Sequence, residues 1–264
     1  MRRLFLFLCL LLLITSITSA AFSYVSTTVK VYPDTEGNAH VTERITIRFD
    51  DANSAQLYDT NMGITNDLTS WKKWTNIDNI RYHVNPNVVS ISNLRITPLP
   101  KRSLSIINPS YEAVLQIDYD AKGLFNKTTI KARTYGYSIK KNSLIFSTNA
   151  RGDIVLEESD NLYIILPENV YVKSVIPLSQ NIDILTKNQK EFFWRGKTTL
   201  ENFDFTYVYE ESMRQEVETY FNSLIENLWE QVGSQEGRYF VVMLLVVFLS
   251  YLLLRWKVKT NERA

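Results

Sequence analysis

The nine residues from Val41 to Phe49, VTERITIRF, show most clearly how the body of this chain folds. Apolar and polar side chains alternate along them, which predicts a strand with one face in a core and the other in solvent. Glu43 interrupts the apolar face, and we expect it to mark a partly exposed edge; a functional position is the alternative. The apolar face carries Val41, Ile45, Ile47 and Phe49, and the polar face carries Thr42, Arg44, Thr46 and Arg48.

The sequence on both sides of this strand also predicts β structure. Residues 34–38, DTEGN, have the composition of a tight turn and predict a hairpin with the strand before them. No helical period is sustained between residues 24 and 209, so we predict a mainly β fold, an antiparallel β-sandwich over residues 21–209 with one or two lobes. The segment 98–109, bracketed by prolines, is the predicted boundary between two lobes. Further strands are expected at 80–84, 88–96, 113–119, 128–132, 144–147, 162–166, 170–175, 182–185, 191–194 and 203–209.

A long apolar run follows this β region. Residues 239–254, YFVVMLLVVFLSYLLL, contain no charged side chain, and as a helix they would extend about 24 Å. Flanking residues lengthen the apolar side, because long basic side chains can lie along it with their charges in the headgroups. We therefore predict one transmembrane helix at 239–256 and a short tail at 257–264.

The N-terminus has the features of a secretory signal. Residues 1–20 combine two arginines, a leucine-rich run and small residues before Ala21, which predicts a cleaved signal peptide. An uncleaved signal anchor is the alternative. Basic residues are more frequent after the predicted span than before it, so we expect the tail in the cytoplasm and the N-terminal body outside the plasma membrane.

Between the β region and the predicted span, the apolar period changes from two to three and four. Residues 210–236 therefore predict an amphipathic helix beside the membrane. Seven glutamates and two arginines lie within residues 210–238, and such an acidic helix gains nothing from anionic lipid. Its apolar stripe is expected to pack on the β body or on a partner, with Tyr220, Leu224 and Leu228 as candidate contacts.

Composition excludes several classes of function. The net charge of +1 argues against nucleic-acid binding, which needs a concentrated basic surface. Cys9, within the predicted signal peptide, is the only cysteine, so disulfides, thiolate metal sites and a cysteine nucleophile are excluded from the mature chain. The two histidines, His40 and His83, have no second ligand at metal-binding spacing, and we expect both at the surface. No cofactor is predicted.

One set of residues imitates an enzyme signature. Ser70-Trp71-Lys72-Lys73, Ser159-Asp160-Asn161 and Lys197-Thr198-Thr199 follow, in this order, the motifs of penicillin-binding proteins and class A β-lactamases. That chemistry needs Ser70 at the start of a helix, beside Lys73. The residues around Ser70 lack a helical apolar stripe, so we predict a protein that is not an enzyme and keep a serine hydrolase or transferase as an alternative.

Three further features are candidates for contact or modification. Trp71 and Trp74 flank two lysines, and exposed aromatic rings there would suit a sugar or protein partner, although core packing of at least one is expected. Arg151-Gly152-Asp153 matches an integrin-binding tripeptide, which a loop of this composition often contains by chance. Asn126-Lys127-Thr128 is the only glycosylation acceptor sequence without proline.

The complete layout resembles that of prokaryotic surface proteins with a signal peptide, a β-sandwich ectodomain and one C-terminal anchor. The resemblance rests on the strand HVTERITIRF at 40–49, on ILPENV at 165–170, on Ile176-Pro177 and on Trp194-Arg195-Gly196. These proteins share no activity that could be transferred to this chain. We expect a membrane-anchored binding or structural protein that contacts a protein partner or a cell-envelope component; the alternative is an accessory subunit that docks through residues 210–232.

Overall fold

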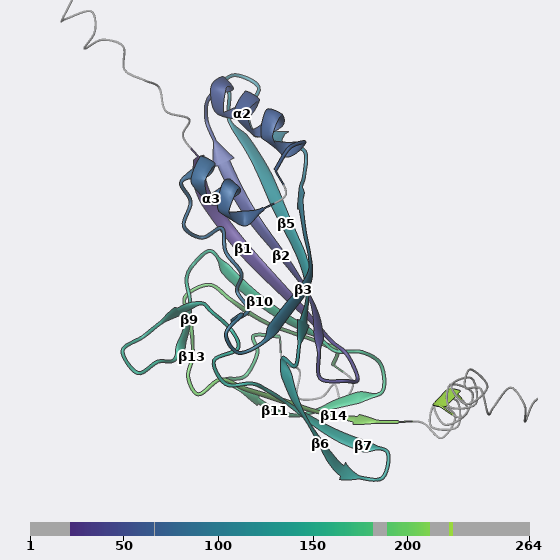
Figure 1. Cartoon of the computed structure of the whole chain (residues 1–264). Helices are drawn as coiled ribbons and strands as arrows, with labels where there is room; N and C mark the ends of the chain where they lie inside the picture. The colour runs from purple at the N-terminus through teal and green to yellow at the C-terminus, as the bar shows by residue number, and fades with distance from the viewer. Residues whose placement is uncertain (1–21, 66, 182–188, 212–221, 224–264) are drawn as a thin grey trace, which may run out of the picture. The chain divides into compact units, whose positions relative to one another are not determined.

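The structure, a computed structural model, describes residues 22–65, 67–181, 189–211 and 222–223. Residues up to Glu210 form one compact unit, and the chain from Glu211 onward forms another. The described residues of the first unit form three β-sheets and two short helices, so the predicted mainly β class is confirmed (Figure 1). The predicted signal at 1–20, the span at 239–256, the tail at 257–264 and nearly all of the helix at 210–236 lie outside the described residues. Among the residues that are described, no helix is both long and apolar enough to cross a membrane.

The largest sheet has seven strands. Six lie in the order β12-β10-β1-β2-β5-β3, and β4 also pairs with β5. β1 and β10 are parallel, with Thr27 opposite Asp160, so this sheet is mixed rather than antiparallel as predicted. The proposed lobe boundary at 98–109 connects neighbouring strands of this same sheet. The strands are β1 (Phe22–Pro33), β2 (Ala39–Phe49), β3 (Ser90–Pro98), β4 (Arg102–Ser103), β5 (Tyr111–Lys122), β10 (Asp160–Ile165) and β12 (Glu191–Arg195).

Two smaller sheets complete the β structure. A four-stranded antiparallel sheet has the order β11-β14-β7-β6, and a three-stranded sheet has the order β13-β9-β8. The expected strand at 80–84 contributes only an isolated bridge from Val84 to Leu144, whereas β7, β9 and β13 were not predicted. The strands are β6 (Phe125–Lys131), β7 (Thr134–Ile139), β8 (Ser147–Thr148), β9 (Ile154–Leu156), β11 (Val170–Ile176), β13 (Thr198–Leu200) and β14 (Asp204–Glu210).

Aromatic side chains join the seven-stranded and four-stranded sheets. Phe192 and Trp194 of β12 both contact Phe205 of β14, with ring centroids 5.3 Å and 6.3 Å apart. Within the four-stranded sheet, Tyr137 stacks on Tyr207 at 4.8 Å. Edge-on and offset contacts of this kind add to the free energy gained by burying the rings, so the two sheets share one core.

The two helices cover the opposite end of the long strands (Figure 1). α2 (Ala52–Met62) and α3 (Leu68–Thr75) each begin after an aspartate whose side chain accepts a hydrogen bond from a first-turn backbone N–H. The prediction that residues 24–209 contain no helix is therefore wrong. Tyr58 of α2 stacks on Phe49 of β2 with ring centroids 5.5 Å apart, which attaches this helix to the sheet.

The hairpin predicted at residues 34–38 is confirmed between β1 and β2. Asp34 Oδ1 accepts hydrogen bonds from the backbone N–H groups of Glu36 and Asn38, at 2.7 Å and 2.8 Å. Gly37 has φ +86°, a backbone conformation that residues with a side chain rarely adopt, and its carbonyl oxygen accepts a hydrogen bond from the backbone N–H of Phe125 in β6 at 2.9 Å. A Cβ at this position would lie 2.7 Å from the Phe125 carbonyl oxygen, so the turn requires glycine.

Replacing Gly37 with alanine is expected to lower the free energy of unfolding by about 1–3 kcal/mol, because it adds backbone strain and a contact with a main-chain oxygen that cannot rotate away. Gly63 is the matched control: its φ is −88°, and an added Cβ would meet no atom within 4 Å. Chemical denaturation of the full-length chain measures both variants. An equal effect of the two substitutions would contradict this account of the turn.

Candidate binding site

The most conspicuous polar cluster in the described residues lies inside the core. Glu43 of β2 is fully buried, and its carboxylate accepts hydrogen bonds from the His83 backbone N–H at 2.8 Å and from the Tyr119 hydroxyl. Its other oxygen lies 2.7 Å from His83 Nδ1. Burial and then the adjacent Glu43 carboxylate raise the pKa of Tyr119, so this hydroxyl remains a donor.

Two predictions are therefore wrong. Glu43 does not lie at an exposed edge, because β1 and β5 flank β2 on both sides. His83 is 3% exposed and packs against the Phe146 ring, so it is not a surface histidine. His40 does lie exposed on the polar face, as predicted, with Nδ1 3.0 Å from Asp120 Oδ1. The Glu43 cluster has its donors and acceptors paired away from solvent, which gives it a structural role.

The predicted contact residues have different surroundings. Trp71 is 1% exposed, and its indole N–H donates to the Thr65 carbonyl oxygen at 3.3 Å. Trp74 packs beside it, with ring centroids 5.1 Å apart, and is half-buried. Core packing of one tryptophan was expected, and Trp71 is that residue. The other three candidate contacts, Tyr220, Leu224 and Leu228, lie outside the described residues.

The residues of the enzyme-like signature are spread over separate elements. Ser70 and Lys73 do lie on a helix, α3, whereas Ser159 lies in the turn before β10. The Ser70 backbone N–H donates to Asp67, which caps this helix. Within the described residues, the hydrogen bonds include none that joins Ser70, Lys73 and Ser159, and no cluster of three or more acidic, histidine or cysteine side chains could hold a metal ion.

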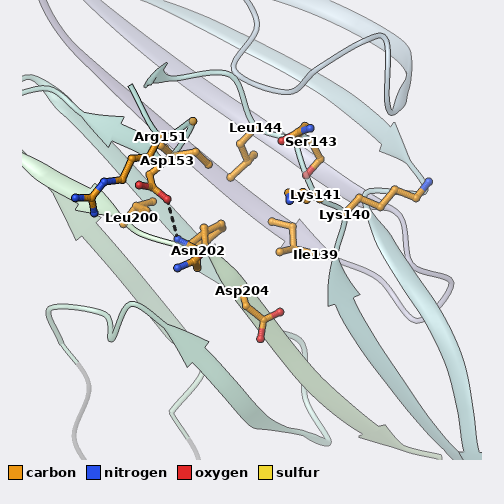
Figure 2. Close-up of a pocket in the computed structure, with 14 residues that line it drawn as sticks. Ile139, Lys140, Lys141, Ser143, Leu144, Arg151, Asp153, Leu200, Asn202 and Asp204 are labelled. Atoms are coloured by element: carbon orange, nitrogen blue, oxygen red, sulfur yellow. Dashed lines mark hydrogen bonds between the residues drawn. The ribbon is translucent and has the colours of Figure 1, made fainter. Parts of the chain in front are cut away.

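A surface cleft of about 370 Å³ is the best candidate for binding (Figure 2). Three turns line it: the turn after β7, the turn before β9 and, much later in the sequence, the turn after β13. Apolar side chains form part of its wall, and charged side chains stand among them. The lining residues are Ile139, Lys140, Lys141, Asn142, Ser143, Leu144, Arg151, Gly152, Asp153, Ile154, Leu200, Asn202, Phe203 and Asp204.

Side-chain hydrogen bonds hold the turn before β9 in its conformation. Asn149 Oδ1 accepts from the backbone N–H groups of Arg151 and Asp153, at 2.9 Å and 3.0 Å. Gly152 takes φ +83°, which completes the tight turn. The Asn202 backbone N–H donates to Asp153 Oδ1 at 3.2 Å and so connects this turn to the one after β13 (Figure 2). The wall of the cleft is therefore built before any ligand arrives.

This geometry also answers the question raised by the Arg-Gly-Asp tripeptide. Both carboxylate oxygens of Asp153 accept hydrogen bonds, one from Asn202 N–H and one from the Asn149 side-chain amide at 2.9 Å. The Asn149 hydrogen bond, followed by the Asn202 hydrogen bond, lowers the pKa of Asp153. The aspartate is thus engaged within the chain, whereas Arg151 is exposed, so the turn does not present the tripeptide as a free ligand.

Positive charge predominates among the cleft's unpaired side chains. Within the described residues, the ion pairs include none to Lys140, Lys141 or Arg151. Of the two carboxylates, Asp153 is bonded as described and Asp204 accepts from the Thr206 hydroxyl at 3.2 Å. Lys140 extends away from the cleft, with its ammonium group near Gly123, whereas Lys141 and Arg151 are exposed cations at the rim without a salt bridge, and they favour an anionic group there.

One buried hydroxyl in the wall of the cleft lacks a hydrogen-bond partner. Ser143 lines the cleft and is only 1% exposed, yet its Oγ has no hydrogen-bond partner among the described residues. Buried polar atoms in proteins are nearly always paired, and Ser143 shares this exception with Ser92, Ser179 and Tyr207. Figure 2 shows Ser143 beside Leu144 and Lys141 at the wall of the cleft.

Sequence reasoning did not find this cleft. Arg151 and Asp153 were noticed only as part of a tripeptide, and Ser143 carries no motif. A faint signal existed, because lysines, asparagines and a glycine recur in the three turns, but nothing local brings residues 140, 151 and 202 together. Comparison of the chain with protein-family models and with curated proteins gives no match.

Proposed function

We propose that this chain is a membrane-anchored, extracytoplasmic binding protein that acts by contact and without catalysis. Its target is an acidic side chain on a partner protein, received in the cleft between the turns after β7, before β9 and after β13. Lys141 and Arg151, both exposed at the rim, would attract the carboxylate. The observation that carries the proposal is this set of cations without ion-pair partners around a preformed cleft.

The form of the cleft favours a group on a protein surface over an enclosed small molecule. Surface turns make its wall, and Lys141 and Arg151 at these turns are exposed. Small-molecule sites bury most of their ligand, whereas exposed charges beside a shallow apolar surface suit the polar rim of a protein interface. Phe203, which is half-buried, would contact an apolar neighbour of the acidic residue.

The proposal also assigns each part of the chain a location relative to the membrane. Residues 1–20 would direct export, residues 21–209 would form a sandwich-like body outside the membrane, and 239–256 would anchor it with the tail 257–264 in the cytoplasm. The support is the apolar run 239–254 and the excess of basic residues after it. An amphipathic helix at 210–236 would separate the body from the bilayer and offer Tyr220, Leu224 and Leu228 to a protein partner.

The charge of the cleft can be tested with defined peptides. We expect a fluorescein-labelled hexaglutamate peptide to bind the full-length protein in non-ionic detergent, and a hexalysine peptide not to bind. Changing Lys141 and Arg151 together to glutamate should weaken hexaglutamate binding at least about tenfold, equivalent to about 1.4 kcal/mol. Fluorescence anisotropy at low ionic strength measures the dissociation constants.

The matched control changes Lys30 and Arg44 to glutamate, because both lie on the outer face of the seven-stranded sheet and the change in net charge is the same. This variant should bind within about twofold of the unmodified protein, apart from the small long-range effect of net charge. Equal weakening in the two double variants would show that the peptide senses overall charge, and the cleft would then lose its assignment.

A further inference from the structure

Strand β6 forms one edge of the four-stranded sheet and is unusually open. Phe125 is buried, but every residue from Asn126 to Lys131 is exposed, and Ile130 retains 54% of its accessible surface. An edge strand presents unpaired backbone groups to which another chain can add a strand. Lysines at 127 and 131 protect this edge in part. The Lys127 side chain, however, forms a salt bridge with Glu36 of the hairpin turn, with 3.1 Å between Nζ and Oε2.

The acceptor sequence Asn126-Lys127-Thr128 lies on this edge. Residues two apart in a strand share a face, so Asn126 and Thr128 project from the same side. Phe125 on the other face packs on Tyr207 in the core, with ring centroids 5.4 Å apart, which turns Asn126 outward. Its amide is exposed, and none of the hydrogen bonds among the described residues involves its side chain.

The sheet surface beside Asn126 consists of small polar side chains. The strand register places Ser138 of β7 opposite Asn126, Thr206 of β14 opposite Ser138, and Ser174 of β11 opposite Thr206. A row of hydroxyl groups therefore crosses the outer face of the sheet at the level of Asn126. Such a row leaves room for a sugar ring and offers it hydrogen bonds.

We infer that Asn126 is a modification site and carries an N-linked oligosaccharide. In this reaction the Asn126 amide nitrogen bonds to the anomeric carbon of a polyprenyl-phosphate-linked oligosaccharide. The carbon–oxygen bond to the lipid phosphate breaks, the phosphate leaves with its electron pair, and the amide loses one proton to the transferase. The glycan would cover the open edge of β6 and block strand addition there.

This inference rests on the outward placement proposed above and not on the cleft. The test is mass spectrometry of the full-length protein isolated from its native membrane. We expect a glycopeptide with the sugar on Asn126, and its loss in both Asn126→Gln and Thr128→Ala. Thr128→Ser should keep the modification, because the acceptor sequence needs a hydroxyl rather than threonine itself. Asn108-Pro109-Ser110, which proline disqualifies, is an internal control and should remain unmodified.

A second experiment distinguishes the absence of the glycan from a wrong assignment of the side of the membrane on which the β body lies. Cys9 is the only natural cysteine, so Thr129→Cys on the exposed strand gives one new thiol for a membrane-impermeant maleimide on intact cells. Protein that reacts with the maleimide but carries no glycan would overturn the glycosylation proposal, while the extracytoplasmic location would still hold. Protein that is neither labelled nor modified would overturn both.

Discussion

Replacing Glu43 with alanine is expected to lower the free energy of unfolding by about 3–5 kcal/mol, an effect as large as any considered for this chain. The carboxylate receives hydrogen bonds from the backbone and ring of His83 and from the Tyr119 hydroxyl. Alanine would leave these buried polar groups without a partner, and each would lose the solvation it had in the unfolded chain. Chemical denaturation followed by near-ultraviolet circular dichroism measures the loss.

Two variants show whether the effect comes from this cluster. Glu43→Gln keeps the size of the side chain and one acceptor oxygen, so it should cost less than alanine. Arg44→Ala changes the adjacent residue on the outer face, where the exposed Arg44 donates to the half-buried Gln116, and should change stability by less than about 1 kcal/mol. A loss below about 1 kcal/mol for Glu43→Ala would mean that the cluster does not stabilise the sheet.

Replacing Trp71 with alanine should lower the free energy of unfolding by about 3–5 kcal/mol, because it leaves a cavity the size of an indole beneath the helices. Trp71 contacts Tyr58 with ring centroids 5.6 Å apart, and Tyr58 in turn stacks on Phe49 of β2. This chain of rings attaches both helices to the sheet. Hydrogen exchange should therefore accelerate throughout residues 52–62 and 68–75 as well as at the mutated site.

Trp74 provides the matched comparison, since it lies three residues later on the same helix and is half-buried. We expect Trp74→Ala to cost less than half as much as Trp71→Ala and to leave exchange in α2 near its original rate. Thermal unfolding and exchange of the same samples distinguish the two. Similar losses for both tryptophans would contradict the separation of a core ring from a surface ring.

The β-strands were largely predictable because their alternation is local. The pattern from Val41 to Phe49 correctly assigned every apolar residue of β2 to the buried face. Glu43 was assigned to that face as well, but its burial depends on donors at residues 83 and 119, which no local pattern reveals. A charged residue in phase with a buried face can indicate a paired polar group as well as an exposed edge.

The helices were missed for different reasons. In α2 only Ser54, Ala55 and Tyr58 are buried, so its apolar stripe is too thin to show a helical period. In α3 the signal was present, because Leu68, Trp71 and Trp74 recur every three residues and Asp67 precedes them. The aspartates that cap these helices look like solvated loop charges until the backbone N–H groups they accept from are known.

The cleft could not have been predicted by the same means. Two of its turns are neighbours in the sequence, but the third, at Asn202, lies 49 residues from Asp153, and the hydrogen bond from Asn202 N–H to Asp153 has no counterpart in local sequence. The parallel pairing of β1 with β10 was equally hidden, because a long connection separates the two strands.

That parallel pairing has a consequence for how the protein is made. Thr27 must wait for Asp160 to be synthesised before the centre of the large sheet can close, and β12 beyond it comes later still. Contacts this distant along the chain slow folding, and a chain that crosses a membrane from its N-terminus would have to keep β1 and β2 from pairing wrongly meanwhile. If the chain is exported as proposed, its maturation should therefore be sensitive to holdase chaperones on the far side of the membrane until residue 195 has emerged.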